Sequence, residues 1–217
     1  MRASARNFAV EKPPISDKDA LMSDVEAVSQ VVLFERQGRD RGWWEQMAAT
    51  FHPDSRVRLS WIDSTGADFV AGSREVSARG ILPTHRVSPP VVHVNGDKAI
   101  ADLAATIQLR FVLHGVSADL DAFVRLVYRV QRFDDRWLIV QLDCIYEHDT
   151  LNPTIPGEVI PIDQEVLSSL RPAYKFLAYH QGEDGHVTPP DLYGDDQPER
   201  IAEFYLSASD WLGLPLR

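Results

Sequence analysis

Apolar residues recur at a helical spacing near both ends of the chain and at alternating positions in its middle. Residues 1–20 are polar and show no sustained period, so we expect a loose arm there. From Ser23 onwards apolar residues recur every three or four positions, which predicts a helix capped by Ser23 or Asp24. Gly38 and Gly42 bracket the break that follows this helix. The apolar side of the predicted helix carries Val25, Val28, Val31, Val32 and Glu35.

A shorter amphipathic helix is predicted next, from Trp44 to Phe51. Pro53 is expected to stop it, because proline cannot continue a helix. The apolar period then changes from helical spacing to alternation. Residues 57–62 predict a strand that turns at 63–66, where the sequence Asp, Ser, Thr, Gly is typical of a turn.

Long alternating runs in the middle of the chain predict an antiparallel meander. A short strand at 91–94 turns into a run from 99 to 113 in which apolar and polar residues alternate. Two further strands, 123–133 and 136–146, are joined at Asp134–Asp135. The positions expected to face inward are Val124, Leu126, Tyr128 and Val130 on the first, and Leu138, Val140, Leu142, Cys144 and Tyr146 on the second.

The tail after residue 152 returns to helical spacing. One helix is predicted at 165–179, and another is predicted to start at Asp196, with Pro198 just inside it, and to end at Gly213. Two helices ahead of several long antiparallel strands predict an α+β fold, in which helices cover one face of a curved antiparallel sheet.

This order of elements divides the chain into three expected parts. Residues 1–22 are expected to form a flexible arm, and residues 23–152 an α+β domain. Residues 153–217 are expected to form a C-terminal helical extension that packs on the domain or on a neighbouring subunit.

The charge balance argues against polyanionic partners. The 217 residues carry 22 Lys and Arg against 32 Asp and Glu, a net charge of -10 at pH 7. Such a surface repels nucleic acid and anionic lipid, so neither is an expected partner. No apolar run approaches the ~18 residues of a membrane span, and the first residues lack the apolar stretch of a secretory signal. We therefore expect a cytoplasmic protein.

The motifs of several chemistries are missing from the sequence. A single cysteine, Cys144, rules out an intramolecular disulfide and any multi-cysteine metal site. The seven histidines lack the spacing of metal ligands, so no metal is expected. Neither G-x-G-x-x-G nor a P-loop motif occurs, so no dinucleotide or other cofactor is expected, and no G-x-S-x-G nucleophile elbow is present.

Four short motifs occur in an order that points to a family. Asp-Arg-Gly-Trp-Trp-Glu occupies 40–45, Phe-His-Pro-Asp 51–54, Thr-His-Arg 84–86 and Asp-Arg-Trp-Leu-Ile 135–139, the last without the usual glycine. Their order and spacing resemble the SnoaL-like family of the nuclear transport factor two-like superfamily over about residues 23–150. This resemblance implies a cone-shaped, cystatin-like α+β barrel with a deep apolar pocket.

Enzymes and non-catalytic proteins share that fold, so the fold alone does not settle the function. Its enzymes include polyketide cyclases, scytalone-type dehydratases, bile acid dehydratases and ketosteroid isomerases. Members commonly pair their sheets, so the resemblance also implies a homo-oligomer, a dimer or a trimer.

The resemblance assigns catalytic roles to His85 and Asp40. His85 matches the catalytic histidine of the family, and imidazole can both accept and return a proton near neutral pH. Asp40 matches the carboxylate that orients that histidine. The alternatives are a histidine that caps a strand and a surface aspartate paired with Arg39 or Arg41.

Five further residues are expected around the substrate pocket. Glu35 stands where related dehydratases often have a tyrosine, and is either a general acid or the partner of an arginine from the sheet. Tyr128 and Tyr146 could polarise a carbonyl oxygen or simply pack in the core. Trp44 and Trp61 are either pocket walls or packing.

These residues together indicate a lyase that dehydrates a small, mostly apolar, oxygenated metabolite of polyketide, terpenoid or steroid type, as in secondary metabolism. His85, oriented by Asp40, would move the proton, and Tyr128 or another donor would stabilise the enolate. An isomerase or a cyclase would use the same pocket. A non-catalytic ligand-binding or assembly module, or a scaffold using the acidic tail at 183–199, also stays open.

Overall fold

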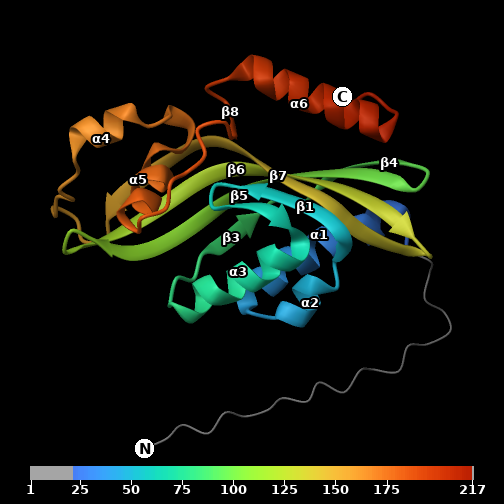
Figure 1. Ribbon diagram of the computed structural model, residues 1–217, viewed down its shortest axis with the longest axis horizontal. Helices are drawn as coiled ribbons and strands as arrows, with labels where there is room; N and C mark the ends of the chain where they lie inside the picture. Colours follow the sequence, from blue (N-terminus) through green and yellow to red (C-terminus); the bar gives the residue numbers. More distant parts are fainter. Residues whose placement is uncertain (1–21, 217) are drawn as a thin grey trace, which may run out of the picture.

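The computed structural model describes residues 22–216, so the predicted arm lies outside the described residues except for Met22. A curved eight-stranded sheet separates three helices on one side from α6 on the other (Figure 1). The helices are α1 (Asp24–Arg41), α2 (Trp44–Ala48), α3 (Gly66–Ala78), α4 (Gln164–Ser169), α5 (Lys175–Glu183) and α6 (Pro198–Leu212), with a 3-10 turn η1 at Pro172–Tyr174. The strands are β1 (Phe51–Leu59), β2 (Ile62–Thr65), β3 (Thr84–Val87), β4 (Val91–Asn95), β5 (Lys98–Leu113), β6 (Val116–Phe133), β7 (Arg136–Pro153) and β8 (Tyr193–Gly194).

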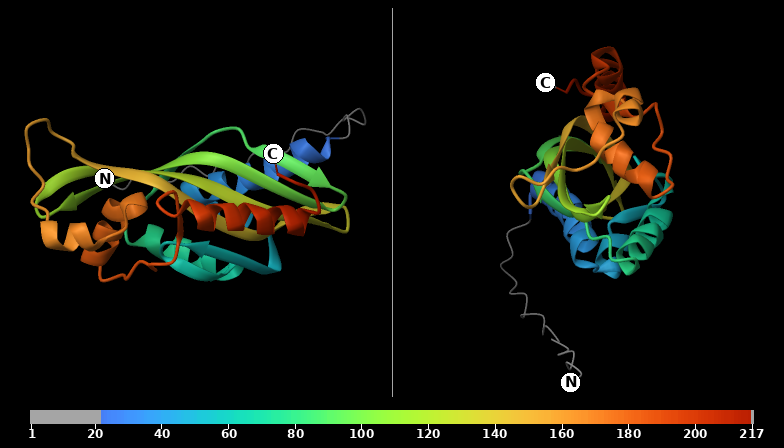
Figure 2. Two further views of the ribbon diagram at one scale, coloured as in Figure 1. Left: turned by 90° about the horizontal axis from the view of Figure 1, so that it is seen from above. Right: turned by 90° about the vertical axis from the view of Figure 1, so that its left-hand side faces the viewer.

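The sheet is mostly antiparallel and strongly curved. Its order is β2-β1-β7-β6-β5-β3, with β4 also paired to β5 and β8 to β7. Only the β1–β7 and β7–β8 pairs are parallel among the described strands. Seen from one end, the sheet is curved, with α1 and α3 below it and α5 beside it (Figure 2). The predicted α+β class, a curved antiparallel sheet covered by helices, is confirmed.

The first predicted helix is present as α1, but its end differs from the prediction. Ser23 caps it with a full capping box, in which Ser23 and Glu26 each bond the other's backbone or side chain. The helix continues through Gly38 and ends at Gly42, which adopts the left-handed conformation with φ 68°. Gly38 is there for packing, since a Cβ would lie 2.9 Å from the Cβ of Met47 in α2.

The second predicted helix is shorter than expected. It ends at Ala48, and Phe51 already begins β1. Pro53 lies inside that strand and does not terminate a helix. It is tolerated because the β1–β7 ladder shifts register between Phe51 and Arg56, so no ladder hydrogen bond is needed there.

The segment predicted to turn at 63–66 instead begins a helix. The chain turns earlier, between β1 and β2, and β2 pairs back along β1. The Thr65 side chain accepts a hydrogen bond from the Asp68 backbone N–H and so caps α3. Phe69 is buried and anchors α3, whose two glycines weaken its sequence signal.

The long antiparallel strands are confirmed and extend further than predicted. β6 starts at Val116, and β7 runs on to Pro153. The hairpin between β6 and β7 turns at Asp134 and Asp135, whose φ angles are 44° and 63°. Both values lie in the left-handed region that a two-residue hairpin requires, and aspartate tolerates it in place of the usual glycine.

One expected face of β7 is wrong in its first half. Leu138 and Val140 were expected inward, whereas Trp137 and Ile139 are buried in the main core. The β6–β7 register shifts at Arg129–Val130, which leaves Val140 unpaired and reverses the alternation. Beyond this bulge the expected positions hold, and the core includes Leu142, Cys144 and Tyr146.

The C-terminal segment covers two different parts of the sheet. The helix predicted at 165–179 is split into α4 and α5 by η1, and both lie at one end of the sheet (Figure 1). α6 has Pro198 in its first turn and Gly213 as its cap, as predicted, although Gln197 takes the N-cap position. The buried residues between α6 and the outer sheet face are Ile100, Val127, Ile145, Phe204, Ala208 and Leu212.

None of the helices within residues 22–216 combines the length and the apolar content that crossing a membrane would require.

Candidate functional site

A cavity of about 490 Å³ occupies the hollow between the sheet, α1, α3 and α5. This volume falls within the range of about 300–1,000 Å³ that is usual for small-molecule sites. Most of its wall is apolar. The apolar wall includes Leu59, Phe69, Ile107, Leu109, Leu126 and Leu177.

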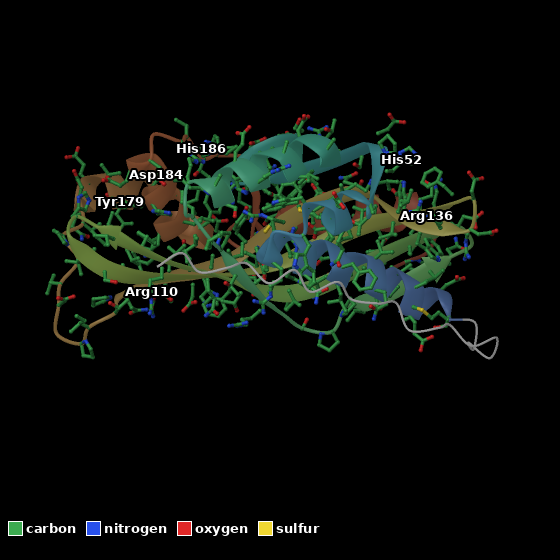
Figure 3. The ribbon with its side chains drawn as sticks, turned by 90° about the horizontal axis from the view of Figure 1, so that it is seen from below. His52, Arg110, Arg136, Tyr179, Asp184 and His186 are labelled. Carbon is green, nitrogen blue, oxygen red and sulfur yellow. The ribbon has the colours of Figure 1, made fainter. Side chains whose placement is uncertain are left out.

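The segment after α5 forms part of the rim. Asp184 and His186 belong to the lining, and they lie beside α5, at the end of the molecule away from His52 and Arg136 (Figure 3). His186 Nε2 lies 3.1 Å from the carbonyl oxygen of Ser60, which connects this segment to the turn after β1. The C-terminal extension therefore helps to build the cavity.

Two elements bring polar groups to the cavity at one place. α1 contributes Arg36 and Arg39, and β3 contributes His85. Asp40 of α1 is not among the lining residues and reaches the site through its bonds to His85. β3 pairs with β5, where His85 lies opposite Ile107. The backbone N–H of His85 also donates to Oδ2 of Asp40 at 2.8 Å, which ties the edge of the sheet to the last turn of α1.

His85 bonds a different partner with each ring nitrogen. Its Nδ1 lies 2.6 Å from Oδ1 of Asp40, and its Nε2 lies 3.2 Å from Nη1 of Arg36. A guanidinium can only donate, so Nε2 must accept and carries a lone pair. We therefore assign the imidazole proton to Nδ1, where it is donated to Asp40. The pair that the sequence predicted is thus brought together.

The surroundings favour a neutral imidazole beside an ionised carboxylate. Burial, together with the positive charge of Arg36, lowers the pKa of His85 below 6.5. Burial alone would raise the pKa of Asp40, but its hydrogen bonds with His85 outweigh that effect and lower the pKa. His85 is accordingly available as a base, with its Nε2 lone pair held by a donor that a substrate could displace.

A buried network behind the cavity holds Arg36 in place. Glu35, with 0% of its surface exposed, is bonded by the guanidinium of Arg36 and by the hydroxyl of Tyr128, which donates at 2.9 Å. Burial lowers the pKa of Arg36, but the Glu35 carboxylate more than offsets this and leaves it raised. The arginine that satisfies Glu35 comes from its own helix, not from the sheet as expected.

The predicted pocket residues divide into two groups. Trp61 and Tyr146 line the cavity, and the Tyr146 hydroxyl accepts a hydrogen bond of 2.8 Å from the Ser60 backbone N–H. Glu35, Trp44 and Tyr128 are not among its lining residues, so the pocket role expected of them is corrected. Glu35 and Tyr128 are hydrogen-bonded to each other inside the core, away from the cavity.

Sequence reasoning missed the arginines of the site. It gave Arg39 a place in a surface ion pair, whereas Arg39 is buried and lines the cavity. A signal was present, since Val28, Val32, Glu35 and Arg39 follow one helical stripe at spacings of four, three and four. The sequence-based prediction of this stripe ends at Glu35 and does not include Arg39.

Sequence reasoning expected the tail to pack on the domain or on a neighbouring subunit, but it named no tail residue as part of the site. His180 lines the cavity from α5 and stacks on Phe111 at a centroid distance of 3.9 Å. No local signal in the sequence places α5 against β5. Within residues 22–216, no group of three or more His, Cys, Asp or Glu side chains is arranged to hold a metal ion.

Comparison with known sequences gives one family and several relatives. A model of the SnoaL-like domain matches residues 20–143. The uncharacterized protein AN9274 of Emericella nidulans is 34% identical over 151 residues, which are 66% of this chain and 63% of that protein, slightly under two thirds of its length. Pea pathogenicity protein 2 of Fusarium vanettenii is 31% identical over 190 residues, which cover 80% of this chain and 79% of that protein.

Comparison with solved structures shows the fold. A hexachlorocyclohexane dehydrochlorinase (LinA) Type2 superposes with a TM-score of 0.51 at 16% identity, covering 61% of this chain and 93% of that one. An NTF2-like protein with a cystatin-like fold from Novosphingobium aromaticivorans gives a TM-score of 0.45 at 18% identity, covering 56% and 80%.

Proposed function

Because this chain belongs to the SnoaL-like domain family, we propose that it is a lyase that removes water from a small oxygenated metabolite. The observation that carries the proposal is the imidazole of His85, bonded through Nδ1 to Asp40 and facing a cavity of about 490 Å³. A neutral histidine, oriented by a carboxylate and with an unprotonated Nε2, is suited to removing a proton next to a carbonyl group once the substrate has displaced Arg36.

The proposed reaction uses one proton twice. Nε2 of His85 takes a proton from the carbon next to the substrate carbonyl, and the electron pair of that C–H bond forms an enolate. The enolate then collapses to a conjugated double bond as the C–O bond to the hydroxyl group breaks. The imidazolium returns its proton to the departing hydroxyl, so water leaves and His85 is neutral again.

Two donors are placed to stabilise the enolate. Arg36 donates to Nε2 of His85 in the resting state, and in the proposed reaction the bound substrate displaces this donor before Nε2 takes the proton. It can then bond the enolate oxygen. Tyr146 lines the same cavity and accepts from Ser60, which leaves its own hydroxyl proton to donate. Tyr146 replaces Tyr128 as the tyrosine of the proposed mechanism.

Isomerisation and cyclisation would begin with the same proton removal. The product distinguishes them, since only dehydration lowers the mass of the substrate by one water. The proposed substrates are hydroxy-carbonyl compounds with an apolar body, because most of the cavity wall is apolar.

The proposal is tested on a panel of such compounds in deuterated water. Mass spectrometry follows both loss of water and uptake of deuterium at the carbon next to the carbonyl. His85→Gln removes the base, and Asp40→Asn removes the carboxylate that fixes its tautomer. Each change is expected to lower turnover by roughly 100-fold or more.

A matched control is His93→Gln, since His93 lies in β4 outside the cavity lining. It is expected to leave turnover unchanged. Folding of every variant is checked by thermal unfolding. Wild-type turnover in folded His85→Gln and Asp40→Asn proteins would show that this pair does not carry the reaction.

A further inference from the structure

Arg39 is a buried cation that faces the cavity. Its side chain comes from the last turn of α1, one turn after Arg36, and only 6% of the residue is exposed. It belongs to the cavity lining, as do Arg36 and His85. A guanidinium carries five N–H donors, which need acceptors wherever water is excluded.

The carboxylates near Arg39 are already in use. Glu35 is bonded to Arg36 and to Tyr128. Asp40 accepts from the ring and from the backbone of His85, one bond to each of its oxygens. Within residues 22–216, the Arg39 guanidinium forms no ion pair and no hydrogen bond, and none of its nitrogens is among the fully buried unpaired atoms, so its donors are open to the cavity.

This arrangement is unusual for a buried charge. Buried cations are normally paired, because removing a charge from water without a partner is costly. Burial and the charge of Arg36 lower the pKa of Arg39 to about 10, so the group is still cationic at neutral pH. The acidic side chains in the lining, Glu75 and Asp184, are exposed residues.

We infer that Arg39 binds a carboxylate group of the ligand, whose apolar body fills the rest of the cavity. The unpaired donors supply a charge-assisted, bidentate bond to two oxygens, a geometry that guanidinium and carboxylate share. The apolar wall from Leu59, Phe69 and Leu126 then packs against the ring or chain that carries the carboxylate. This inference names a chemical group of the substrate and so deepens the proposed function. It rests on the proposed function only where the ligand is called the substrate.

Binding can be measured without turnover, using 2-naphthoate and its neutral analogue 2-naphthamide as probes. The two share one apolar body and differ in charge. Calorimetry on the full chain is expected to show that naphthoate binds the wild-type protein roughly 10- to 100-fold more tightly than naphthamide, the range for a hydrogen-bonded charge in a buried site. Equal affinities, or no binding of either probe, would overturn the inference without any variant.

Three substitutions then assign the preference to one side chain. Arg39→Gln is expected to abolish the preference for naphthoate, and Arg39→Lys to keep part of it, because lysine retains the charge but not the paired donors. Arg74→Gln, on the exposed side of α3 and outside the lining, is the matched control and is expected to keep the full preference. A full preference in folded Arg39→Gln protein would also overturn the inference.

The test of the carboxylate site can fail or succeed independently of the test of the proposed lyase activity. A naphthoate preference that depends on Arg39, in a protein that dehydrates nothing in the panel, supports the carboxylate site and contradicts the lyase. Dehydration of neutral compounds at an unchanged rate in Arg39→Gln protein supports the lyase and contradicts the carboxylate site.

Discussion

At the scale of single residues, the helix α1 sets the chemistry of the cavity through neighbouring positions. Arg36 and Asp40 lie one turn apart and hold opposite sides of the His85 ring. Arg39, between them in sequence, has its donors free toward the cavity. One helical turn thus supplies the group that orients the base, a charge that adds to burial in keeping the base neutral, and a cation without a partner among residues 22–216.

The first prediction concerns Tyr128, which the structure removes from the site. Tyr128→Phe deletes the hydroxyl that donates to buried Glu35 and leaves that acceptor with one partner fewer. We expect a loss of about 1–3 kcal/mol in the free energy of unfolding. Turnover in the deuterium assay is expected to stay close to that of the wild type, because the hydroxyl does not reach the cavity.

Urea unfolding measures the loss of stability in Tyr128→Phe protein, and the deuterium assay on the same preparation measures its turnover. A loss of turnover as large as that of His85→Gln, with little change in stability, would return Tyr128 to the catalytic role that sequence reasoning gave it.

The roles of these residues were predictable to different degrees. The pairing of His85 with Asp40 could be anticipated because both lie in motifs of a recognisable family, although 45 positions separate them. Arg39 was predictable only in part, because its spacing from Val32 and Glu35 continues the apolar stripe of α1, whereas the charged residues that follow it, Asp40 and Arg41, favour a surface position. The cavity beside α1 shows that its side chain turns inward.

At the scale of elements, α1 and α2 pack as closely as backbone allows. The contact is at Gly38, where a Cβ would lie 2.9 Å from the Cβ and 3.0 Å from the backbone nitrogen of Met47. Met47 is fully buried, so the contact has little room to relax.

Gly38→Ala is therefore expected to destabilise the protein by about 1–3 kcal/mol, because overpacking outweighs the gain in helix propensity. Gly182→Ala is the matched control, since Gly182 lies in α5 with no atom within 4 Å of an added Cβ. It is expected to stabilise by up to ~1 kcal/mol. Thermal and urea unfolding measure both, and a stabilising Gly38→Ala would show that α2 can move aside.

Three elements differ from the sequence-based prediction, and each difference has a physical cause. The sequence predicts that Pro53 ends a helix, but Pro53 lies where the hydrogen-bond ladder between β1 and β7 is interrupted. Strict alternation was assumed along β7, but the extra residue at Val140 reverses it. The helix α3 was missed because its N-cap, Thr65, closes a sequence that is equally typical of a turn. Long alternating runs without such interruptions, as in β5, were predicted well.

At the scale of the whole molecule, the two faces of the sheet serve different purposes. The concave face forms the cavity with α1, α3 and α5. The outer face is covered by α6, which buries a separate apolar cluster with Ile100, Val127 and Ile145 (Figure 1). The family match ends at residue 143, yet residues 177–186 of the tail line the cavity.

This separation predicts that α6 can be displaced without loss of the site. Ala208→Asp places a charge at a position with 0% exposure, where no partner awaits it, and is expected to detach α6 from the sheet. Leu206→Asp is the control, since Leu206 is 64% exposed on the same helix.

Exposed apolar surface in Ala208→Asp protein is expected to increase its sedimentation coefficient through self-association and to enhance the fluorescence of a hydrophobic dye. Binding of 2-naphthoate is expected to persist. Unchanged sedimentation and dye binding, or loss of naphthoate binding together with α6, would contradict the independence of the two faces.

The most direct test of the account is the state of the His85 ring itself, measured by ¹⁵N NMR on protein with labelled histidine. The account predicts that His85 carries its proton on Nδ1, in a hydrogen bond to Asp40, and an unprotonated Nε2. It also predicts that this neutral form persists as the pH falls below 6.5, because burial and Arg36 lower the pKa. Asp40→Asn is expected to disturb the Nδ1 signal. A proton on Nε2, or protonation of the ring at or above pH 6.5, would contradict the central claim that His85 stands as a neutral, oriented base.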